Sequence, residues 1–482
     1  MNASDTGAGR PPDSNSSSLA PEVRLKLIAS IVCLAIPLAI LFAPLGLENQ
    51  TQVAFAITAF MILAWMTHVI DYAVAGLIGC VLFWMSGVVA PEVAFNGYSR
   101  TITWFVLAAL LLGAIGTKSG LPQRIGGFIV TRVGLSYSGI LLGLIITDFL
   151  LTFVVPTGVG RVVIMATIAL GIIKLFNVGK GSNVARGIFL IITYTATIFD
   201  KMIIAGAASI TARGAIIQYG DVEVGWGLWF IAFLPCDLLT ILAAWKITQW
   251  LFPPEVKSIA GKEEALREQF RIKGGWTPES RRAAFIILGT VVVWVTDIFH
   301  GIDPALVAVT AAIVAMLPYV GVLTINDVRK IDLMPFFFVG AALSMSAVLR
   351  ETGGLEVLIS TVLAGTEPWF ANEITAVPLL YWGAFVYHLL LASEISMLAS
   401  SLPVLMEFAK ANELDPLWIG LVWTFAAGGK LFVYQTAVLV VGYSYGYFRH
   451  TDLIKLGAAI TVVEFFNVIV TTMFWWPLIG LS

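Results

Sequence analysis

Ionisable residues inside long apolar runs are the groups of this sequence best suited to chemistry. Arg161 ends the broken stretch TFVVPTGVGR, and Asp200 and Lys201 stand together in TATIFDKMIIAG. Lys430 lies in FAAGGKLFVYQTA, and Glu394 lies in LLASEISML. A charge inside a membrane segment is costly, so by default it marks a pathway for ions or substrates. Cations in such places can hold an anion, and carboxylates can bind a cation or a proton.

The composition indicates that a membrane surrounds these charges. Of the 482 residues, 59% are hydrophobic and 12% are charged, with a mean hydropathy of +0.91. A soluble chain carries roughly 25% charged residues, so we expect a polytopic protein whose principal partner is the lipid bilayer. The net charge of -2 gives no indication of nucleic-acid binding. Cys33, Cys80 and Cys236 lie in apolar runs without the paired spacing of disulfides or zinc sites.

Eleven segments are apolar and long enough to cross a hydrocarbon core, which needs about 20 residues. They lie near residues 25–45, 52–69, 71–89, 101–117, 186–216, 226–252, 283–299, 303–320, 333–350, 417–446 and 455–480. Two further apolar pairs, 137–155 with 159–176 and 375–392 with 396–410, have short arms separated by breaks. We interpret them as re-entrant hairpins, whose broken backbone must be covered by protein or water. The predicted fold class is an all-α polytopic membrane protein.

The distribution of basic residues predicts the orientation. Residues 1–24 are rich in Ser, Gly, Pro and Asp, and we expect a disordered cytoplasmic tail without a cleavable signal. The positive-inside rule then places the base of the first hairpin and the polar segment 253–282 in the cytoplasm. The acidic base of the second hairpin and the C-terminus fall outside. We therefore expect an integral protein of the plasma (inner) membrane.

The order of elements occurs twice along the chain. A first span and its connection occupy residues 25–51, and two repeats follow at 52–252, with hairpin 137–176, and at 283–482, with hairpin 375–410. Each repeat contains three spans, a hairpin, a span with a polar interruption and a final span. Because five crossings is an odd number, the second repeat must be inverted, and 253–282 is the cytoplasmic linker between them. Inverted repeats with broken helices at matching positions are typical of secondary transporters, whose site lies at the repeat interface.

One long segment also resembles a known family. The stretch GLIGCVLFWMSGVVAPEVAFNGYSRTITWFVLAALLLGAIGTKSGLPQRI is similar to the first repeat of the divalent anion:sodium symporters, which carry di- and tricarboxylates and sulfate. WFIAFLPCDLLTILAAWKITQWLFPPE fits the end of the same repeat, and the likeness covers nearly the whole chain after about residue 35. The resemblance implies a homodimer and an elevator mechanism, in which a moving part carries substrate past a scaffold. In this family each hairpin tip bears a Ser-Asn-Thr motif that contacts a carboxylate substrate and helps to bind sodium.

Both of these motifs are missing here. The first tip reads PTG at residues 156–158, and the second reads SEI at residues 393–395. The family's Gly-Thr-Pro-Pro-Asn-like stretches in the interrupted helices are replaced by AGAASITA and VYQTAVLV. Sodium needs several oxygen ligands that converge on one point, so these changes argue against the family's usual pair of sodium sites.

Basic residues near the breaks suggest what replaces sodium. We expect Lys201 and Lys430 to act as fixed or titratable countercharges. Arg161 lies one turn past the first tip and would hold an anionic group. The positive end of the half-helix near Val159 and Gly160 would assist it.

The predicted site therefore lies at the two tips and the two interruptions. The predicted substrate-binding residues are Pro156, Thr157, Gly158, Arg161, Ser393, Glu394, Ile395, Ser396, Gln435 and Thr436. The predicted coupling or countercharge residues are Asp200, Lys201, Lys430 and Glu394. We expect no cofactor and name no metal ligand; the coupling ion stays open, with a proton or exchange favoured over sodium.

Structural roles are the alternatives for these charges. Asp200 could neutralise Lys201, and Arg161 could bridge to Asp148 or Glu394. Lys430 could extend along its helix toward the interface. Glu394 could bind a cation, accept a coupling proton or pair with Arg161. Four other charged residues lie near span ends, and we expect no site role for them: Arg213, Asp237, Asp297 and Glu464.

We therefore predict a permease that moves an organic anion, a carboxylate or sulfonate, by an elevator mechanism and without the usual sodium sites. The alternatives are a sodium-coupled dicarboxylate or sulfate symporter with altered ligands and a cation/proton antiporter of the wider superfamily. A channel or a sensor that no longer transports is a third possibility. No nucleophile–base pair or metal cluster stands out in the sequence, which argues against an enzyme.

Overall fold

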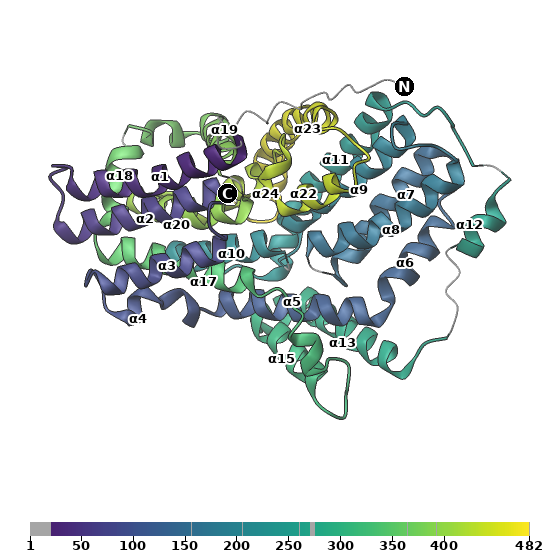
Figure 1. The fold of residues 1–482 in the computed structure, drawn as a ribbon, viewed down its shortest axis with the longest axis horizontal. Helices are drawn as coiled ribbons and strands as arrows, with labels where there is room; N and C mark the ends of the chain where they lie inside the picture. Colours follow the sequence, from purple (N-terminus) through teal and green to yellow (C-terminus); the bar gives the residue numbers. More distant parts are fainter. Residues whose placement is uncertain are drawn as a thin grey trace, which may run out of the picture.

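The computed structural model describes residues 21–155, 157–204, 206–259, 261–269, 275–363, 365–391 and 393–481. Helices joined by short connections make up the fold (Figure 1). The predicted tail lies almost wholly outside the described residues, as do residues 270–274 of the linker.

The first helix and the first repeat contain twelve elements. They are α1 (Pro21–Phe42), α2 (Asn49–Thr67), α3 (Tyr72–Met85), α4 (Pro91–Ala94), η1 (Asn96–Ser99), α5 (Thr101–Ser119), α6 (Leu121–Val130), α7 (Tyr137–Thr152), α8 (Gly158–Phe176), α9 (Asn183–Met202), α10 (Ala207–Gly220) and α11 (Trp226–Leu251).

The linker and the second repeat supply the other elements. They are α12 (Glu263–Gln269), α13 (Pro278–Val295), α14 (Asp297–His300), α15 (Pro304–Met316), α16 (Ile325–Val328), α17 (Met334–Glu351), α18 (Gly354–Val362), η2 (Glu367–Ala371), α19 (Glu373–Leu390), α20 (Glu394–Ala411), α21 (Pro416–Ala426), η3 (Val433–Gln435), α22 (Ala437–Ser444), α23 (His450–Val470), η4 (Thr471–Trp475) and α24 (Trp476–Leu478).

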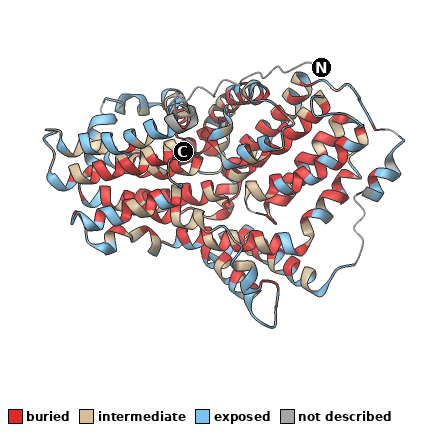
Figure 2. Cartoon of the chain, in the orientation of Figure 1, coloured by how far each residue is buried: buried red, intermediate tan, exposed pale blue. Residues whose placement is uncertain are grey.

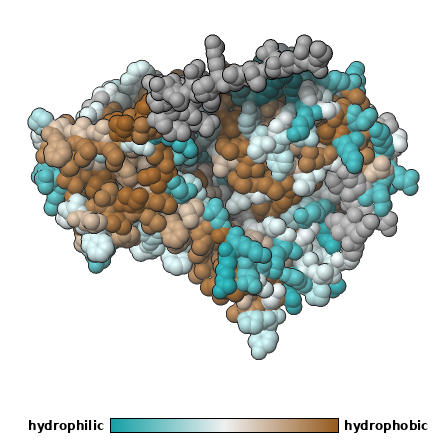
Figure 3. Space-filling view, in the orientation of Figure 1, coloured by the Kyte–Doolittle hydropathy of each residue, from teal (hydrophilic) through white to brown (hydrophobic). Residues whose placement is uncertain are grey.

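The all-α prediction is confirmed, and each of the eleven predicted spans falls on one to three consecutive helical elements. Within the described residues, eight helical segments are long and apolar enough to cross a membrane, by length and composition. Large apolar side chains are exposed on the outer helices: Leu34 of α1 is 60% exposed and Phe285 of α13 is 79% exposed. Brown, apolar atoms cover much of the left part of the face in Figure 3, where α1, α2 and α3 lie. Such a surface suits lipid contact rather than water.

Capping residues explain where several helices start. Ser136 accepts a hydrogen bond from the Gly139 amide at the start of α7, and Ser182 accepts one from Ala185 at the start of α9. Asp71 caps α3 in the same way. An N-cap side chain satisfies an amide that has no partner within the helix, which is why Ser and Asp are favoured there. Polar capping residues thus set where these helices begin within a largely apolar sequence.

The two repeats pack with matching partners. Helix α5 lies against α15 of the second repeat, and its counterpart α17 lies against α3 of the first. Likewise α20 packs along α10, and its counterpart α8 packs against α22. The long helices α11 and α23, which are counterparts, pack against each other. This exchange of partners is what a two-fold relation between the repeats requires.

Segments assigned to the same side of the membrane do lie together. At the base of the first hairpin, the Tyr137 amide donates to the Lys257 carbonyl of the linker at 2.9 Å, and the Ile259 amide donates to Leu135 at 3.0 Å. At the base of the second hairpin, Lys410 pairs with Asp221 at 2.9 Å. The basic and the acidic loops are therefore grouped as the charge distribution predicts.

The interrupted helix of the first repeat forms the centre of the molecule. In the most apolar stretch of Asn183–Gly220, 94% of the residues are buried, whereas in that of α19 only 33% are. Buried residues dominate the middle of the molecule in Figure 2, and exposed ones gather on the outer helices. Asp200 and Lys201 lie in the last turn of α9 in this buried centre, where Lys201 is fully buried and Asp200 keeps 17% of its side chain exposed.

Candidate substrate and coupling site at the helix breaks

Four breaks in the helices define the candidate site. Both hairpins break, at residues 153–157 and 391–393, and both interrupted helices break, at residues 203–206 and 427–436. A new helix begins after each break, so α8, α10, α20 and α22 each start there. A helix start presents a positive dipole end and amides without helical partners, which together attract anions.

The breaks approach each other across the repeats. A Cβ atom on Gly158, at the start of α8, would lie 2.6 Å from Oδ2 of Asp200 and 2.8 Å from Cγ2 of Val438 in α22. The first hairpin tip therefore touches the first interruption and the start of α22. The second tip is joined to the second interruption through an ion pair between Glu394 and Lys430. Glycine is needed at 158 because any side chain would push these groups apart.

Arg161 lies fully buried behind the first tip and is surrounded by acceptors. Its Nε lies 3.1 Å from Oδ1 of Asp148, and its Nη2 lies 2.8 Å from Oδ1 of Asp200. Further donors reach the carbonyls of Val155 and Ala196, at 3.2 and 2.7 Å. Thr195 donates to the second oxygen of Asp148. A buried guanidinium with this many hydrogen bonds is held in one orientation.

Lys201 points from the first repeat into the second interruption. Its Nζ donates to the Phe425 carbonyl at 3.2 Å and lies 3.7 Å from Oε1 of Glu464 on α23. A Cβ atom on Gly428 would lie 1.7 Å from this ammonium, so the glycine leaves the space that Lys201 fills. The carbonyl of Lys201 itself accepts a hydrogen bond from the indole of Trp229.

Lys430 and Glu394 form the third buried pair, at 3.2 Å. His388 lies beside them, and its Nε2 is 3.2 Å from the Gln435 carbonyl. The Gln435 side chain turns inward, where its oxygen accepts hydrogen bonds from the amides of Leu431 and Phe432 at 2.6 and 2.8 Å. Gln435 therefore closes the backbone of the second interruption.

Carboxylates outnumber cations in this cluster. The buried or nearly buried acids are Asp148, Asp200, Asp237, Glu394 and Glu464, and the cations are Arg161, Lys201 and Lys430. The members act on one another electrostatically: Lys430 and Glu394 reach Asp200, and Lys201 and Lys430 reach Asp237 and Glu464. The cluster is one coupled network rather than three isolated pairs.

The structure brings together most of the predicted site residues. Pro156 lies outside the described residues. Thr157, Ser393, Ile395 and Thr436 are partly exposed at the breaks, whereas Gly158, Ser396 and Gln435 are buried. Asp200, at 17% exposure of its side chain, is the most accessible of the clustered charges that form ion pairs. Surface access thus lies at the tips, and most of the charge lies behind them.

The ion pairs differ in part from the alternatives considered for the sequence. Arg161 does bridge to Asp148, but Asp200 pairs with Arg161 and not with Lys201. Glu394 pairs with Lys430 and not with Arg161. Sequence reasoning missed Asp237 and Glu464, which are fully buried. The signal was present, since both stand in apolar runs, LPCDLL and TVVEFF.

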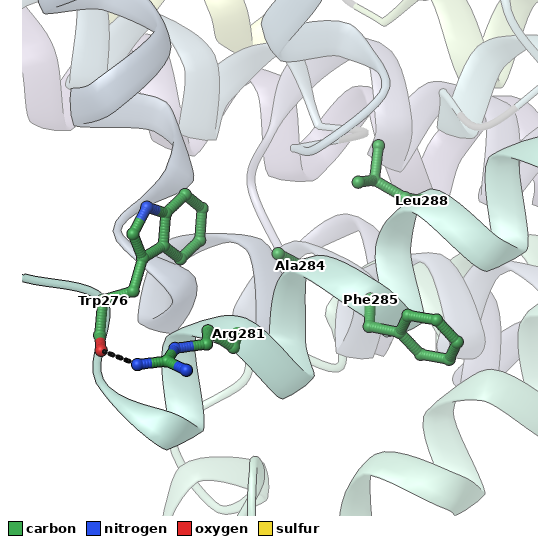
Figure 4. Close-up of a pocket in the computed structure, with 5 residues that line it drawn as sticks. All are labelled: Trp276, Arg281, Ala284, Phe285 and Leu288. Carbon is green, nitrogen blue, oxygen red and sulfur yellow. Dashed lines mark hydrogen bonds between the residues drawn. The ribbon is translucent and has the colours of Figure 1, made fainter.

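One surface pocket borders the breaks. It has a volume of about 420 Å³ and is lined by Met66 and His68 at the end of α2, Leu389 and Leu390 before the second tip, and Tyr434 and Val440 beside the second interruption. A second pocket, of about 480 Å³, lies on α13, away from the breaks. The cation in its lining, Arg281, donates a hydrogen bond to the carbonyl of Trp276 (Figure 4). Only the first of these two pockets adjoins a helix break.

Comparison with known proteins identifies the family. Residues 24–482 match the family described as the sodium:sulfate symporter transmembrane region. The chain belongs to this family. It is 27% identical to a membrane protein of Cupriavidus necator over 80% of this chain and 79% of that one. It is 24% identical to the L-tartrate/succinate antiporter of Escherichia coli (strain K12) over 94% of this chain and 98% of that one.

The fold also has a solved counterpart. The YdaH transporter of Alcanivorax borkumensis matches with a TM-score of 0.51 and 16% identity, over 95% of this chain and 98% of that one. At this identity the likeness concerns the fold alone. The family resemblance drawn from the sequence is confirmed, and the chain is an integral membrane protein of a transporter family.

Proposed function

We propose that this protein is a secondary active transporter of a small dicarboxylate-type anion, driven by exchange or by protons rather than through the family's usual sodium sites. Support for the substrate class comes from the family and from the relatives named as L-tartrate/succinate antiporters. Support for the coupling comes from the buried cations at the helix breaks.

The position of Lys201 is the observation that carries this proposal. Its ammonium fills the space against Gly428 and donates a hydrogen bond to the Phe425 carbonyl in the last turn of α21, just before the second interruption. A backbone carbonyl at a helix break is the type of ligand that a hard cation such as sodium takes. A covalently attached ammonium there supplies the positive charge that a bound sodium ion would otherwise bring.

The tips supply the contacts for the substrate. Thr157, Ser393 and Thr436 are partly exposed and precede the starts of α8, α20 and α22. Among the residues that the structure describes, no side chain caps α8, so its first amides are available for a carboxylate of the substrate. Two helix starts from opposite repeats suit an anion with a carboxylate at each end. Arg161 lies behind the first tip, where its ion pairs with Asp148 and Asp200 hold the tip in place.

The wider mechanism follows the family expectation. We propose an elevator motion, a homodimer, a cytoplasmic N-terminus and linker, and an outside C-terminus. The grouping of basic segments at the base of the first hairpin supports this orientation.

Counterflow in proteoliposomes tests the proposed function. Vesicles loaded with unlabelled succinate or L-tartrate should accumulate the labelled anion from a sodium-free medium. Ser393→Ala and Glu394→Gln should reduce the rate, because they change the second tip. Lys410→Gln, which alters an exposed pair, is the matched control and should transport normally. Strict sodium dependence that survives with unchanged sodium affinity in Lys201→Ala and Lys430→Ala would contradict the proposal.

A cation-coupled carrier or a cation/proton antiporter is the second candidate, since the cluster holds more carboxylates than cations. Asp200, Glu394 and Asp148 would then handle the ion. This candidate predicts that sodium or proton flux persists when no anion is supplied. The proposed anion carrier predicts flux only when a transported anion is present.

A further inference from the structure

Two buried carboxylates lie on neighbouring helices of the network, away from the tips. Asp237 is on α11 and Glu464 is on α23, and these two helices pack against each other. Both side chains are 0% exposed. Within the part of the chain that the structure describes, none of their four carboxylate oxygens has a hydrogen-bond donor. Proposed contacts with substrate at the tips involve neither residue.

Among the described residues, Lys201 is the cation that forms an ion pair with these acids, and it does so with Glu464. Lys201 lies 3.7 Å from Oε1 of Glu464, beyond hydrogen-bond distance, and donates to the Phe425 carbonyl instead. Lys430 also acts on both acids, but its ammonium is engaged by Glu394 at 3.2 Å. The titratable and charged groups that act on the two acids or are acted on by them are Lys201, Lys430, Glu394, Tyr194, Tyr381 and Cys236.

Two ionised acids in this place would be very costly. An ionised carboxylate that is buried without donors loses most of its favourable solvation. One ammonium compensates one negative charge, so a second negative charge would remain unbalanced. The cost disappears when one of the acids takes up a proton and becomes neutral, as closely spaced acids commonly do.

We propose that Asp237 and Glu464 form a proton-binding site that holds one proton at neutral pH and releases it during transport. The site rests on the proposed function for its role in transport, although proton binding itself does not require a substrate. Release of the proton to water leaves a second negative charge beside Lys201. That charge would draw the Lys201 ammonium away from the Phe425 carbonyl, so the second interruption would lose this hydrogen bond from Lys201. In the proposed mechanism, these two acids are therefore the place where the coupling proton is bound.

Infrared spectroscopy of the purified full-length protein in lipid nanodiscs tests proton binding without any substrate. The carbonyl stretch of a protonated carboxylic acid should be present at pH 7. It should be lost or shifted in Asp237→Asn or in Glu464→Gln. Glu407→Gln, which alters a carboxylate already paired with Arg350 and Lys410, is the matched control and should keep the band. A band that is absent at pH 7, or unchanged in both site variants, overturns the proposal.

Isotope labelling removes any dependence on the variants. The wild-type band should shift when the protein is grown with ¹³C-labelled aspartate or ¹³C-labelled glutamate. A band that responds to neither label overturns the proposal even if both variants fail to fold.

Transport then separates this site from the proposed function. In proteoliposomes that carry a lumenal pH dye, succinate entry should acidify the lumen of wild-type vesicles. Asp237→Asn should retain succinate counterflow but should show the same uptake with and without a pH gradient. If wild-type vesicles move no dicarboxylate while the infrared band behaves as expected, the proposed function fails and the proton site stands. Unchanged gradient-driven uptake in both Asp237→Asn and Glu464→Gln rejects the proton site alone.

Discussion

The buried pair of Arg161 and Asp200 should be worth far more than an exposed pair of the same length. Its N–O distance is 2.8 Å, and the distance between Lys410 and Asp221 at the surface is 2.9 Å. Coulomb's law at an effective dielectric constant of about 20 gives about 6 kcal/mol at such a separation. Because Asp200 is 17% exposed, water reduces this value, and we expect a coupling energy of about 2–4 kcal/mol.

Double-mutant cycles measure this difference directly. One cycle combines Arg161→Met with Asp200→Asn, and the control cycle combines Lys410→Met with Asp221→Asn. Arg161→Met alone should cost about 3–5 kcal/mol, because it leaves two buried acids without their guanidinium. The side chain of Asp221 is 71% exposed, so the control cycle should give only about 0–1 kcal/mol.

The assay is equilibrium unfolding in mixed lipid–detergent micelles, titrated with a denaturing detergent and followed by tryptophan fluorescence. Arg161→Lys provides a variant that keeps the charge if Arg161→Met does not fold. A coupling energy between Arg161 and Asp200 no larger than that of the control pair would refute the claim that burial, rather than distance, sets the strength of these ion pairs.

Two other outcomes follow from the geometry. Gly158→Ala would place a methyl group 2.6 Å from Asp200, so counterflow should fall at least several-fold with normal expression, whereas Gly179→Ala, which has no heavy atom within 4 Å, should transport normally. Burial raises the pKa of Glu255, but amides at the start of α9, including that of Asn183 at 2.7 Å, outweigh this and hold the pKa below its usual range. A carboxylate with a depressed pKa stabilises the fold at pH values above its unfolded pKa of about 4.3, and this stabilisation is lost as the group becomes protonated at lower pH. Glu255→Gln should therefore lower the melting temperature more at pH 7 than at pH 4. Equal shifts at both pH values would contradict this.

The lengths of the apolar runs and the proline and glycine residues that interrupt them predicted the architecture well. The arms of the first hairpin, α7 and α8, differ by at most three residues from the predicted 137–155 and 159–176. The reason is that proline and glycine interrupt long apolar runs, and a membrane allows such breaks only where protein or water covers them. Both polar interruptions likewise became real helix breaks. Local sequence was sufficient because each break is a local event.

The partners of the buried charges were harder to predict. Arg161 and Asp148 lie on the two arms of one hairpin, so a bridge between them was among the alternatives that the sequence offered. Lys201 and Glu464 come from opposite repeats, and only the packing of α9, α11 and α23 brings them together. The inward turn of Gln435 was also hidden, since it depends on the path of the backbone at residues 431–432. Long-range packing decides these contacts, and one sequence carries no record of it.

The positive charges of Lys201 and Lys430 remain in the carrier when it holds no substrate. A carrier that binds sodium can release it, so its site loses that positive charge before the empty protein returns. Lys201 and Lys430 cannot leave, and their charge must be balanced in every state. Glu464 and Glu394 provide that balance from within the protein.

Substrate binding adds negative charge to a network whose acids already exceed its cations. Uptake of a proton is the direct way to offset that charge, and replacement of one dianion by another is the second way, because it leaves the total unchanged. Under the proposed function, both routes would dispense with a bound sodium ion. That proposal expects exchange when a second anion is available and proton-coupled movement when it is not.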